Sequence, residues 1–142
     1  GMAIGLGQAA LDMTRALLAE EGYEDKFGGS MHQQTAVQYE LEMLEAELEA
    51  ARLLVYKSAW MMDNKMPNSK EASMGKAKAG RIGNRISLKC VEICSMQGFS
   101  EEHLLEKFSR DSKILDIFEG TQQIQQLIVA RQVLNKSSSD LK

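Results

Sequence analysis

A single carboxylate near the end of this 142-residue chain has neighbours that suit chemistry. Glu119 lies between Phe118 and Gly120, directly before a segment whose apolar periodicity is typical of a helix. A carboxyl group beside apolar side chains can have its pKa raised toward neutral pH, which suits a general base. The start of a helix also offers free backbone N–H groups to an anionic ligand. The pattern therefore fits either a general base or a glutamate favoured at this position only by the helix dipole.

The other residues capable of chemistry do not form a recognisable site. A ferritin-like di-iron centre needs a Glu three residues before a His, and neither His32 nor His103 has one. Cys90 and Cys94 would share one face of a helix, but no nearby residue completes a zinc site. Two buried cysteines are the favoured interpretation, and a Cys–His nucleophile pair stays open without further support. The sequence therefore predicts no metal site.

Helical periodicity indicates the elements that position these residues. Apolar side chains recur at spacings of three and four, and no alternating strand pattern is present. The clearest helix runs from about Gln33 to Asn64, and the first helix should end near Gly22. The only proline is Pro67, a scarcity that suits long helices. We therefore predict an all-α fold, an antiparallel four-helix bundle with a short extra helix.

The third predicted helix has a distinctive composition. Small residues precede its apolar stripe: Gly75, Ala77, Ala79, Gly80 and Gly83. Small side chains lower helix propensity but allow neighbouring helices to pack closely, so we expect this helix at the centre of the bundle. A shorter helix is expected from Ser100 to about Ser109, and the last helix should begin near Gly120. The bundle is expected to occupy residues 1–136, and 137–142 should form a frayed tail.

The composition of the chain argues against nucleic acid and membranes as binding partners. Hydrophobic residues make up 44% of the chain, and 17 Lys and Arg against 20 Asp and Glu give a net charge of −3. Without a long basic block, nucleic acid is not an expected partner. No signal peptide is recognisable after Met2, and the polar helix faces are rich in Glu rather than Lys or Arg. We therefore expect a cytoplasmic protein with no membrane insertion.

The residues around Glu119 belong to a longer motif. It reads RDxKI at 110–114, IFEGTxxIQ at 117–125 and IVAR at 128–131. This motif resembles the C-terminal signature of the flavin-dependent acyl-CoA dehydrogenases. Further similar segments follow in the same order: AIG at 3–5, AAL at 9–11, FG at 27–28, AVQY at 36–39, EAARLLVY at 49–56, AW at 59–60 and GF at 98–99. The resemblance to the C-terminal helical domain of this family covers nearly the whole chain.

The resemblance implies a FAD enzyme that introduces an α,β double bond into an acyl-CoA thioester. In such enzymes a glutamate takes the α-proton while a hydride leaves the β-carbon for the flavin, and electrons then pass to an electron-transfer flavoprotein. Glu119 falls on the position of this catalytic base, and Gly120 would lie against the thioester. Thr121 and Gln123 would fall on flavin contacts. Family members assemble as dimers or tetramers through this domain, so we expect self-association.

Several positions differ from the residues that are usual in this family. Glu24 stands where an Arg faces the cofactor pyrophosphate, which turns attraction into repulsion. Thr35 replaces a usual Gln, and Gln126 replaces a frequent Arg. Ser95 and Met96 replace a Gly-Gly pair whose bare backbone can approach the cofactor. These differences imply that FAD binding by this chain alone is weak or lost.

Two functions from different classes follow. On the first, the resemblance implies a C-terminal domain or split piece of an acyl-CoA dehydrogenase-like oxidoreductase, which we expect to be inactive alone because family enzymes place a helical domain and a β domain before this bundle. Alternatively, the chain is a non-catalytic scaffold or oligomerisation module that is derived from the family and has lost the flavin. An unrelated helical bundle would require the ordered motifs to be coincidental. Stoichiometric FAD in the purified chain would count against the scaffold.

Overall fold

The computed structural model of the protein describes residues 1–23 and 30–140. The regular elements within these ranges are helices, and none of the described residues forms a strand. In chain order the α-helices are α1 (Met2–Glu20), α2 (Ala36–Asp63), α3 (Ser69–Gly98), α4 (Leu105–Ile117) and α5 (Gln122–Leu134). Two short 3-10 helices span Met31–Gln33 and Ser138–Asp140. The prediction of an all-α fold is confirmed.

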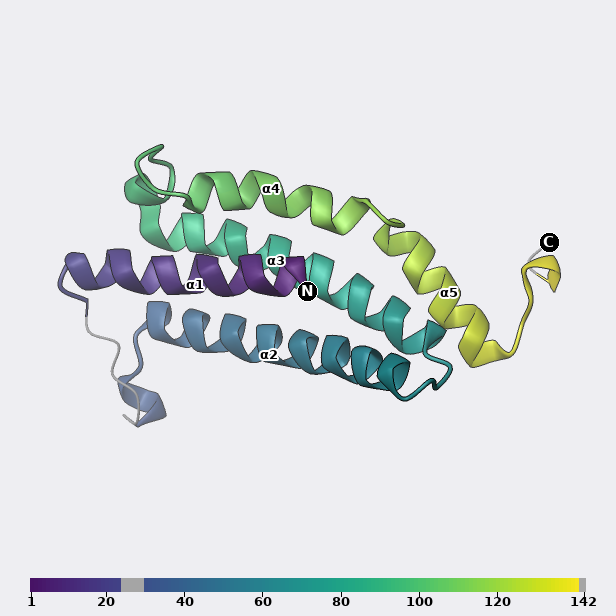
Figure 1. The fold of residues 1–142 in the computed structure, drawn as a ribbon. Helices are drawn as coiled ribbons and strands as arrows, with labels where there is room; N and C mark the ends of the chain where they lie inside the picture. The colour runs from purple at the N-terminus through teal and green to yellow at the C-terminus, as the bar shows by residue number, and fades with distance from the viewer. Residues whose placement is uncertain (24–29, 141–142) are drawn as a thin grey trace.

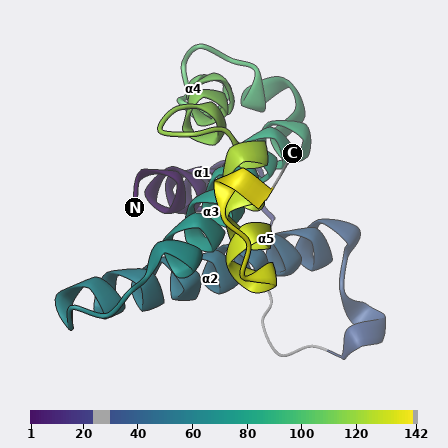
Figure 2. The ribbon, with the colours of Figure 1, turned by 90° about the vertical axis from the view of Figure 1, so that its right-hand side faces the viewer.

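The helix α3 runs through the middle of the bundle and packs against α1, α2, α4 and α5. Consecutive helices from α1 to α4 reverse direction, as in an antiparallel bundle (Figure 1). The view from the end places α2 and α4 on opposite sides of α3 (Figure 2). Beyond α4, the chain turns into α5, which lies along the N-terminal half of α3. This arrangement places the connection between α4 and α5 close to α3.

The small residues of α3 explain why it is central. A Cβ atom on Gly83 would lie 2.8 Å from the carbonyl oxygen of Ala3 in α1. A Cβ atom on Gly80 would lie 3.1 Å from the carbonyl oxygen of Leu115 in α4. Since a side chain at either position would push a neighbouring backbone away, the glycines allow α1 and α4 to approach α3 on two faces. The expectation of a central helix with close neighbours is confirmed.

Apolar side chains fill the space where α1, α2 and α3 meet. The largest that are fully buried are Leu11, Leu41, Leu44, Leu48, Ile82 and Ile86, and Leu105 of α4 joins the same core. By contrast, none of the side chains of α5 is buried, and Val133 and Leu134 are each more than 60% exposed. The core therefore lies toward the α1 side of α3, and α5 lies on the surface.

Across the described residues, no helix combines the length and the apolar character that crossing a bilayer would take.

The helix α4 differs from the prediction. A helix from Ser100 to about Ser109 was expected, but the chain turns at 101–104 and α4 runs from Leu105 to Ile117. Leu105 is fully buried at its start, and Ser112 is fully buried in its second half. Because both side chains belong to one inward face, packing continues the helix through the RDSKI segment. The expected boundaries are wrong because local turn signals do not contain this tertiary contact.

Candidate active site

The four residues from Phe118 to Thr121 connect α4 to α5 and present Glu119. Glu119 has φ +56° and Gly120 has φ +97°, so two consecutive residues adopt left-handed backbone conformations. For a residue with a side chain, such a conformation costs about 1–2 kcal/mol. Gln125 Nε2 donates to the carbonyl oxygen of Glu119 at 3.2 Å, and a Cβ atom on Gly120 would lie 2.6 Å from this nitrogen. The φ of Gly120 therefore favours glycine at this position, whereas the Gln125 amide could move aside.

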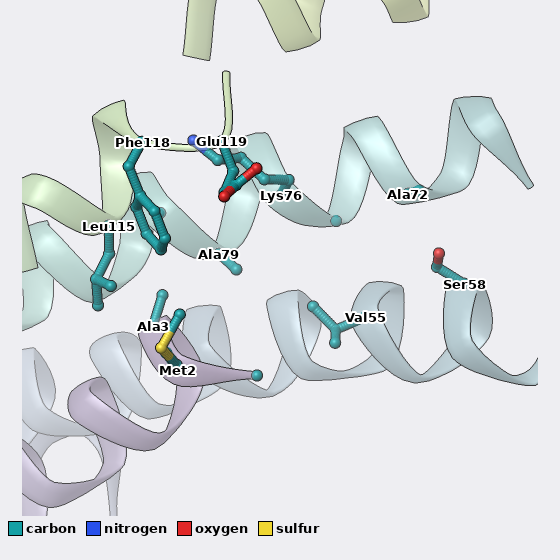
Figure 3. Close-up of a pocket in the computed structure, with 13 residues that line it drawn as sticks. Met2, Ala3, Val55, Ser58, Ala72, Lys76, Ala79, Leu115, Phe118 and Glu119 are labelled. Atoms are coloured by element: carbon teal, nitrogen blue, oxygen red, sulfur yellow. The ribbon is translucent and has the colours of Figure 1, made fainter. Parts of the chain in front are cut away.

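The Glu119 side chain is exposed and lies at a pocket of about 260 Å³. The pocket is formed by the N-terminal end of α1, the C-terminal half of α2, the N-terminal half of α3 and the end of α4. Figure 3 shows the Glu119 carboxylate between the Phe118 ring and Lys76. Leu115, Val55 and Ala79 line the pocket further, so its surface is largely apolar. The site therefore places one carboxylate at the edge of an apolar hollow.

The other predicted site residues lie at the start of α5, in the turn after Glu119. Thr121 is the N-cap of α5, and its hydroxyl oxygen accepts a hydrogen bond from the Ile124 backbone N–H at 3.4 Å. Gln123 is exposed in the first turn of this helix. The structure therefore gathers Glu119, Gly120 and Thr121 in one turn, with Gln123 one helical step away.

Two basic residues of α3 at this turn had no signal in the sequence. Lys76 Nζ donates to the backbone carbonyl oxygen of Asp116 at 3.1 Å. Arg81 donates to the side-chain oxygen of Gln122 through Nε at 3.2 Å and through Nη2 at 2.5 Å. These contacts join residues 40 and 41 positions apart, so neither local spacing nor a short motif could indicate them.

The two cysteines are structural. Cys90 is fully buried, and Cys94 is 6% exposed. Burial raises the pKa of the Cys90 thiol to about 11, so it stays protonated at neutral pH. Since the thiolate is the reactive form, Cys90 is unsuited to nucleophilic catalysis. The prediction of two buried cysteines is confirmed.

Comparison with known proteins shows the family to which this chain belongs. The family model described as "Acyl-CoA dehydrogenase, C-terminal domain" matches residues 1–134. The chain belongs to the acyl-CoA dehydrogenase family. The match includes Glu119 and the whole of α1 to α5. The resemblance inferred from the ordered motifs is thereby confirmed.

Individual relatives in the acyl-CoA dehydrogenase family agree with this assignment. A probable acyl-CoA dehydrogenase of Bacillus subtilis is 35% identical over 133 residues, which cover 94% of this chain and 34% of the relative. A subunit of the caffeyl-CoA reductase–Etf complex of Acetobacterium woodii is 38% identical with the same coverage. The solved structure of butyryl-CoA dehydrogenase from Megasphaera elsdenii matches with a TM-score of 0.71 and 30% identity, covering 93% of this chain and 36% of that one. The chain thus spans about a third of the length of these relatives.

Thr35, one of the positions that the resemblance led us to expect to weaken FAD binding, has a structural role. It is the N-cap of α2, where its hydroxyl oxygen accepts from the Gln38 backbone N–H at 3.1 Å. The Tyr23 hydroxyl lies 2.8 Å from the same oxygen. Glu24 lies outside the described residues. Thr35 therefore anchors the start of α2.

Ser95 and Met96 lie at a kink in α3. Ser95 has φ +51° and ψ −125°, a backbone conformation that is favourable for glycine and strained for serine. Met96 is 86% exposed. Just beyond the kink, a Cβ atom on Gly98 would lie 2.4 Å from the carbonyl oxygen of Val91. The chain therefore has a glycine-like bend at Ser95, and the bend carries two side chains.

Proposed function

We propose that this chain is the C-terminal part of an acyl-CoA dehydrogenase and that Glu119 is its catalytic base. The reaction is the α,β-dehydrogenation of an acyl-CoA thioester. The observation that carries the proposal is a strained left-handed Glu119 at the edge of an apolar pocket, within a segment that matches the family. Backbone strain persists where the surrounding structure enforces it, and such residues cluster at active sites. The conformation therefore supports a functional rather than a merely helix-capping glutamate.

The proposed chemistry uses the carboxylate of Glu119. The thioester carbonyl acidifies the α-C–H bond, and Glu119 accepts the α-proton as a general base. The β-carbon loses a hydride, and the two remaining electrons of the α-C–H bond form the double bond. FAD, when bound, supplies the hydride acceptor. The apolar walls formed by Phe118 and Leu115 suit an acyl chain, and Gly120 is proposed to lie against the thioester.

The chain alone is proposed to be inactive. It spans 34% of the curated relatives, so about two thirds of such an enzyme is missing from it. Thr121 and Gln123 supply a hydroxyl and an exposed amide at the start of α5, groups that suit a polar cofactor edge. Ser95 and Met96 fit a cofactor poorly, since their side chains occupy a bend where bare backbone would allow close approach. We therefore propose that this chain alone binds FAD weakly.

A non-catalytic scaffold is the second candidate. It is favoured by the same Ser95 and Met96 and by Thr35, whose hydroxyl is engaged by its own helix. Both candidates include self-association as a dimer or tetramer, because large apolar side chains such as Trp60, Val133 and Leu134 are exposed. A monomer in light scattering at micromolar concentration would contradict this. Electron transfer to a flavoprotein partner belongs to the first candidate alone.

The test of the catalytic proposal restores the missing parts. This chain replaces the C-terminal third of the butyryl-CoA dehydrogenase of Megasphaera elsdenii, and butyryl-CoA-dependent bleaching of the flavin is followed. Glu119→Gln should reduce the rate about 10²–10⁴-fold, the contribution typical of a general base, at unchanged flavin content. Glu102→Gln, which removes an exposed carboxylate in the turn before α4, serves as the matched control. Bleaching that persists in the Glu119→Gln enzyme would refute the assignment, and a chimera without flavin would favour the scaffold.

A further inference from the structure

We infer that Gln122 is a positioning residue for Glu119, acting through a hydrogen-bonded bridge between Arg81 and Asp116. The bridge closes the turn that carries Glu119 and ties both of its ends to α3. Its catalytic meaning rests on the proposed function of Glu119, but its effect on the conformation of the turn does not.

The bridge spans the turn between α4 and α5. Asp116 lies three residues before Glu119 and Gln122 three residues after it. Gln122 Nε2 donates to Asp116 Oδ1 at 3.1 Å, which joins the last turn of α4 to the first residue of α5. The same nitrogen lies 3.5 Å from the Ala77 carbonyl oxygen of α3. The ends of the turn are thereby held together over the surface of α3.

Both ends of the turn are also fixed to α3 by cations. Arg81 donates to Gln122 Oε1, and Lys76 donates to the Asp116 backbone oxygen at the end of α4. Lys76 lines the same pocket as Glu119 and lies beside it in Figure 3. A cation at the C-terminal end of a helix also interacts favourably with the helix dipole. One helix therefore holds both sides of the turn.

An amide is the group that this bridge needs at position 122. Its oxygen accepts from the Arg81 guanidinium while its nitrogen donates to the Asp116 carboxylate. A carboxylate at this position would still accept from Arg81, but it would face Asp116 as a like charge. An apolar side chain would make neither hydrogen bond. The isosteric change Gln122→Glu therefore distinguishes hydrogen bonding from simple packing.

The bridge holds the start of α5 against the bundle, in addition to the contacts that Lys76 and Gln125 make with the turn. None of the side chains of α5 is buried, so apolar burial contributes little to the attachment of its first turn. The left-handed conformation of Glu119 is costly and persists only when the surroundings enforce it. Gln125 holds the Glu119 carbonyl from within the turn, whereas Gln122 holds the turn against the bundle. Loss of the bridge should therefore release the backbone of Glu119.

The test is solution NMR of the full chain. A residue with positive φ gives a strong intraresidue HN–Hα cross-peak, which reports the conformation of Glu119 directly. We expect Gln122→Glu to weaken this cross-peak to the intensity of a residue with negative φ and to shift the Gly120 amide, and Gln122→Ala to do the same. Gln132→Glu, an equal change at an exposed position of α5, should alter neither signal. A Glu119 cross-peak that stays as strong as in the parent in both Gln122 variants would overturn the inference.

A variant that reverses the direction of the hydrogen bond between positions 116 and 122 provides the decisive control. When Gln122→Glu is combined with Asp116→Asn, the amide and the carboxylate exchange places, and the cross-peak of Glu119 should regain its full intensity. A purely structural loss of the α5 start would not be rescued in this way, and failure of the rescue would overturn the inference. Far-UV circular dichroism confirms that each variant keeps its helices. The two proposals can fail separately. If the turn responds as expected but Glu119→Gln leaves the activity of the chimera unchanged, the bridge is supported and the proposed function is refuted.

Discussion

The hydroxyl oxygens of Ser87 in α3 and Ser112 in α4 lie 2.9 Å apart, and both residues are fully buried. Asn84 Nδ2 also donates to the Ser112 oxygen at 2.8 Å, and Ser112 donates in turn to the Ser109 carbonyl oxygen. This polar network fixes the rotation of α4 about its own axis against α3. Because the turn with Glu119 follows directly after α4, the pair also sets the direction from which Glu119 reaches its pocket.

Removal of the Ser112 hydroxyl should destabilise the bundle. In Ser112→Ala the Asn84 amide loses a partner in a partly buried site, and an unsatisfied polar group costs about 1–3 kcal/mol. Urea unfolding followed by circular dichroism measures the change in the free energy of unfolding. Ser109→Ala is the control on the same helix, since its hydroxyl bonds within α4 to the Glu106 carbonyl oxygen. Equal stabilities of the two variants would contradict the role of the interhelical network.

Relief of the strain at Ser95 should stabilise the chain. Ser95→Gly places glycine where φ is +51° and ψ is −125°, and such strained positions cost about 1–3 kcal/mol. We expect the free energy of unfolding to rise by about 1 kcal/mol, the low end of that range, because glycine also gains entropy in the unfolded chain. Met96→Gly, one residue further along, should instead lower stability by about 0.5–1 kcal/mol. A Ser95→Gly variant less stable than the parent would show that the bend is not strained.

The same bend should influence FAD binding. The parent chain is expected to bind FAD weakly, and the double change Ser95→Gly with Met96→Gly should strengthen binding by exposing bare backbone. Titration of FAD with increasing protein, followed by flavin fluorescence anisotropy, measures the affinity. Thr35→Ala is the comparison at a position whose hydroxyl caps α2, and it should lower stability without strengthening FAD binding. Equal affinities of the parent and the double variant would place the cofactor elsewhere.

Burial of Cys90 should make the stability depend on alkaline pH. Its pKa is raised from 9.0 to about 11 in the folded chain, chiefly because burial disfavours the thiolate. The unfolded chain therefore releases this proton first, so the contribution of Cys90 is fully present below pH 9 and is lost as the pH rises through about 11. Urea unfolding between pH 8 and pH 10.5 should show a steeper loss in the parent than in Cys90→Ala. Parallel pH profiles for the two proteins would contradict the burial effect.

Much of the fold could be predicted from residue spacing. The stripe through Val37, Leu41, Leu44 and Leu48 predicted the long helix α2, because one face of a helix must be apolar to enter a core. The small residues of α3 predicted a central helix for the same local reason, since they remove the bulk that keeps backbones apart. The motif around Glu119 indicated the family. These features depend on residue type and near neighbours, which the sequence contains directly.

The tertiary structure decided what holds the site. The extension of α4 through Ser112, the bend at Ser95 and the bridge from Arg81 to Gln122 all depend on surfaces that meet only after folding. Gln122 shares its residue type with Gln123, and no periodicity distinguishes the two. Their difference arises because α3 brings Arg81 to one of them across 41 residues of chain. The sequence alone determined the helices and the family. A hydrogen bond between distant helices depends on packing geometry, so only the fold determined which residues support the turn with Glu119.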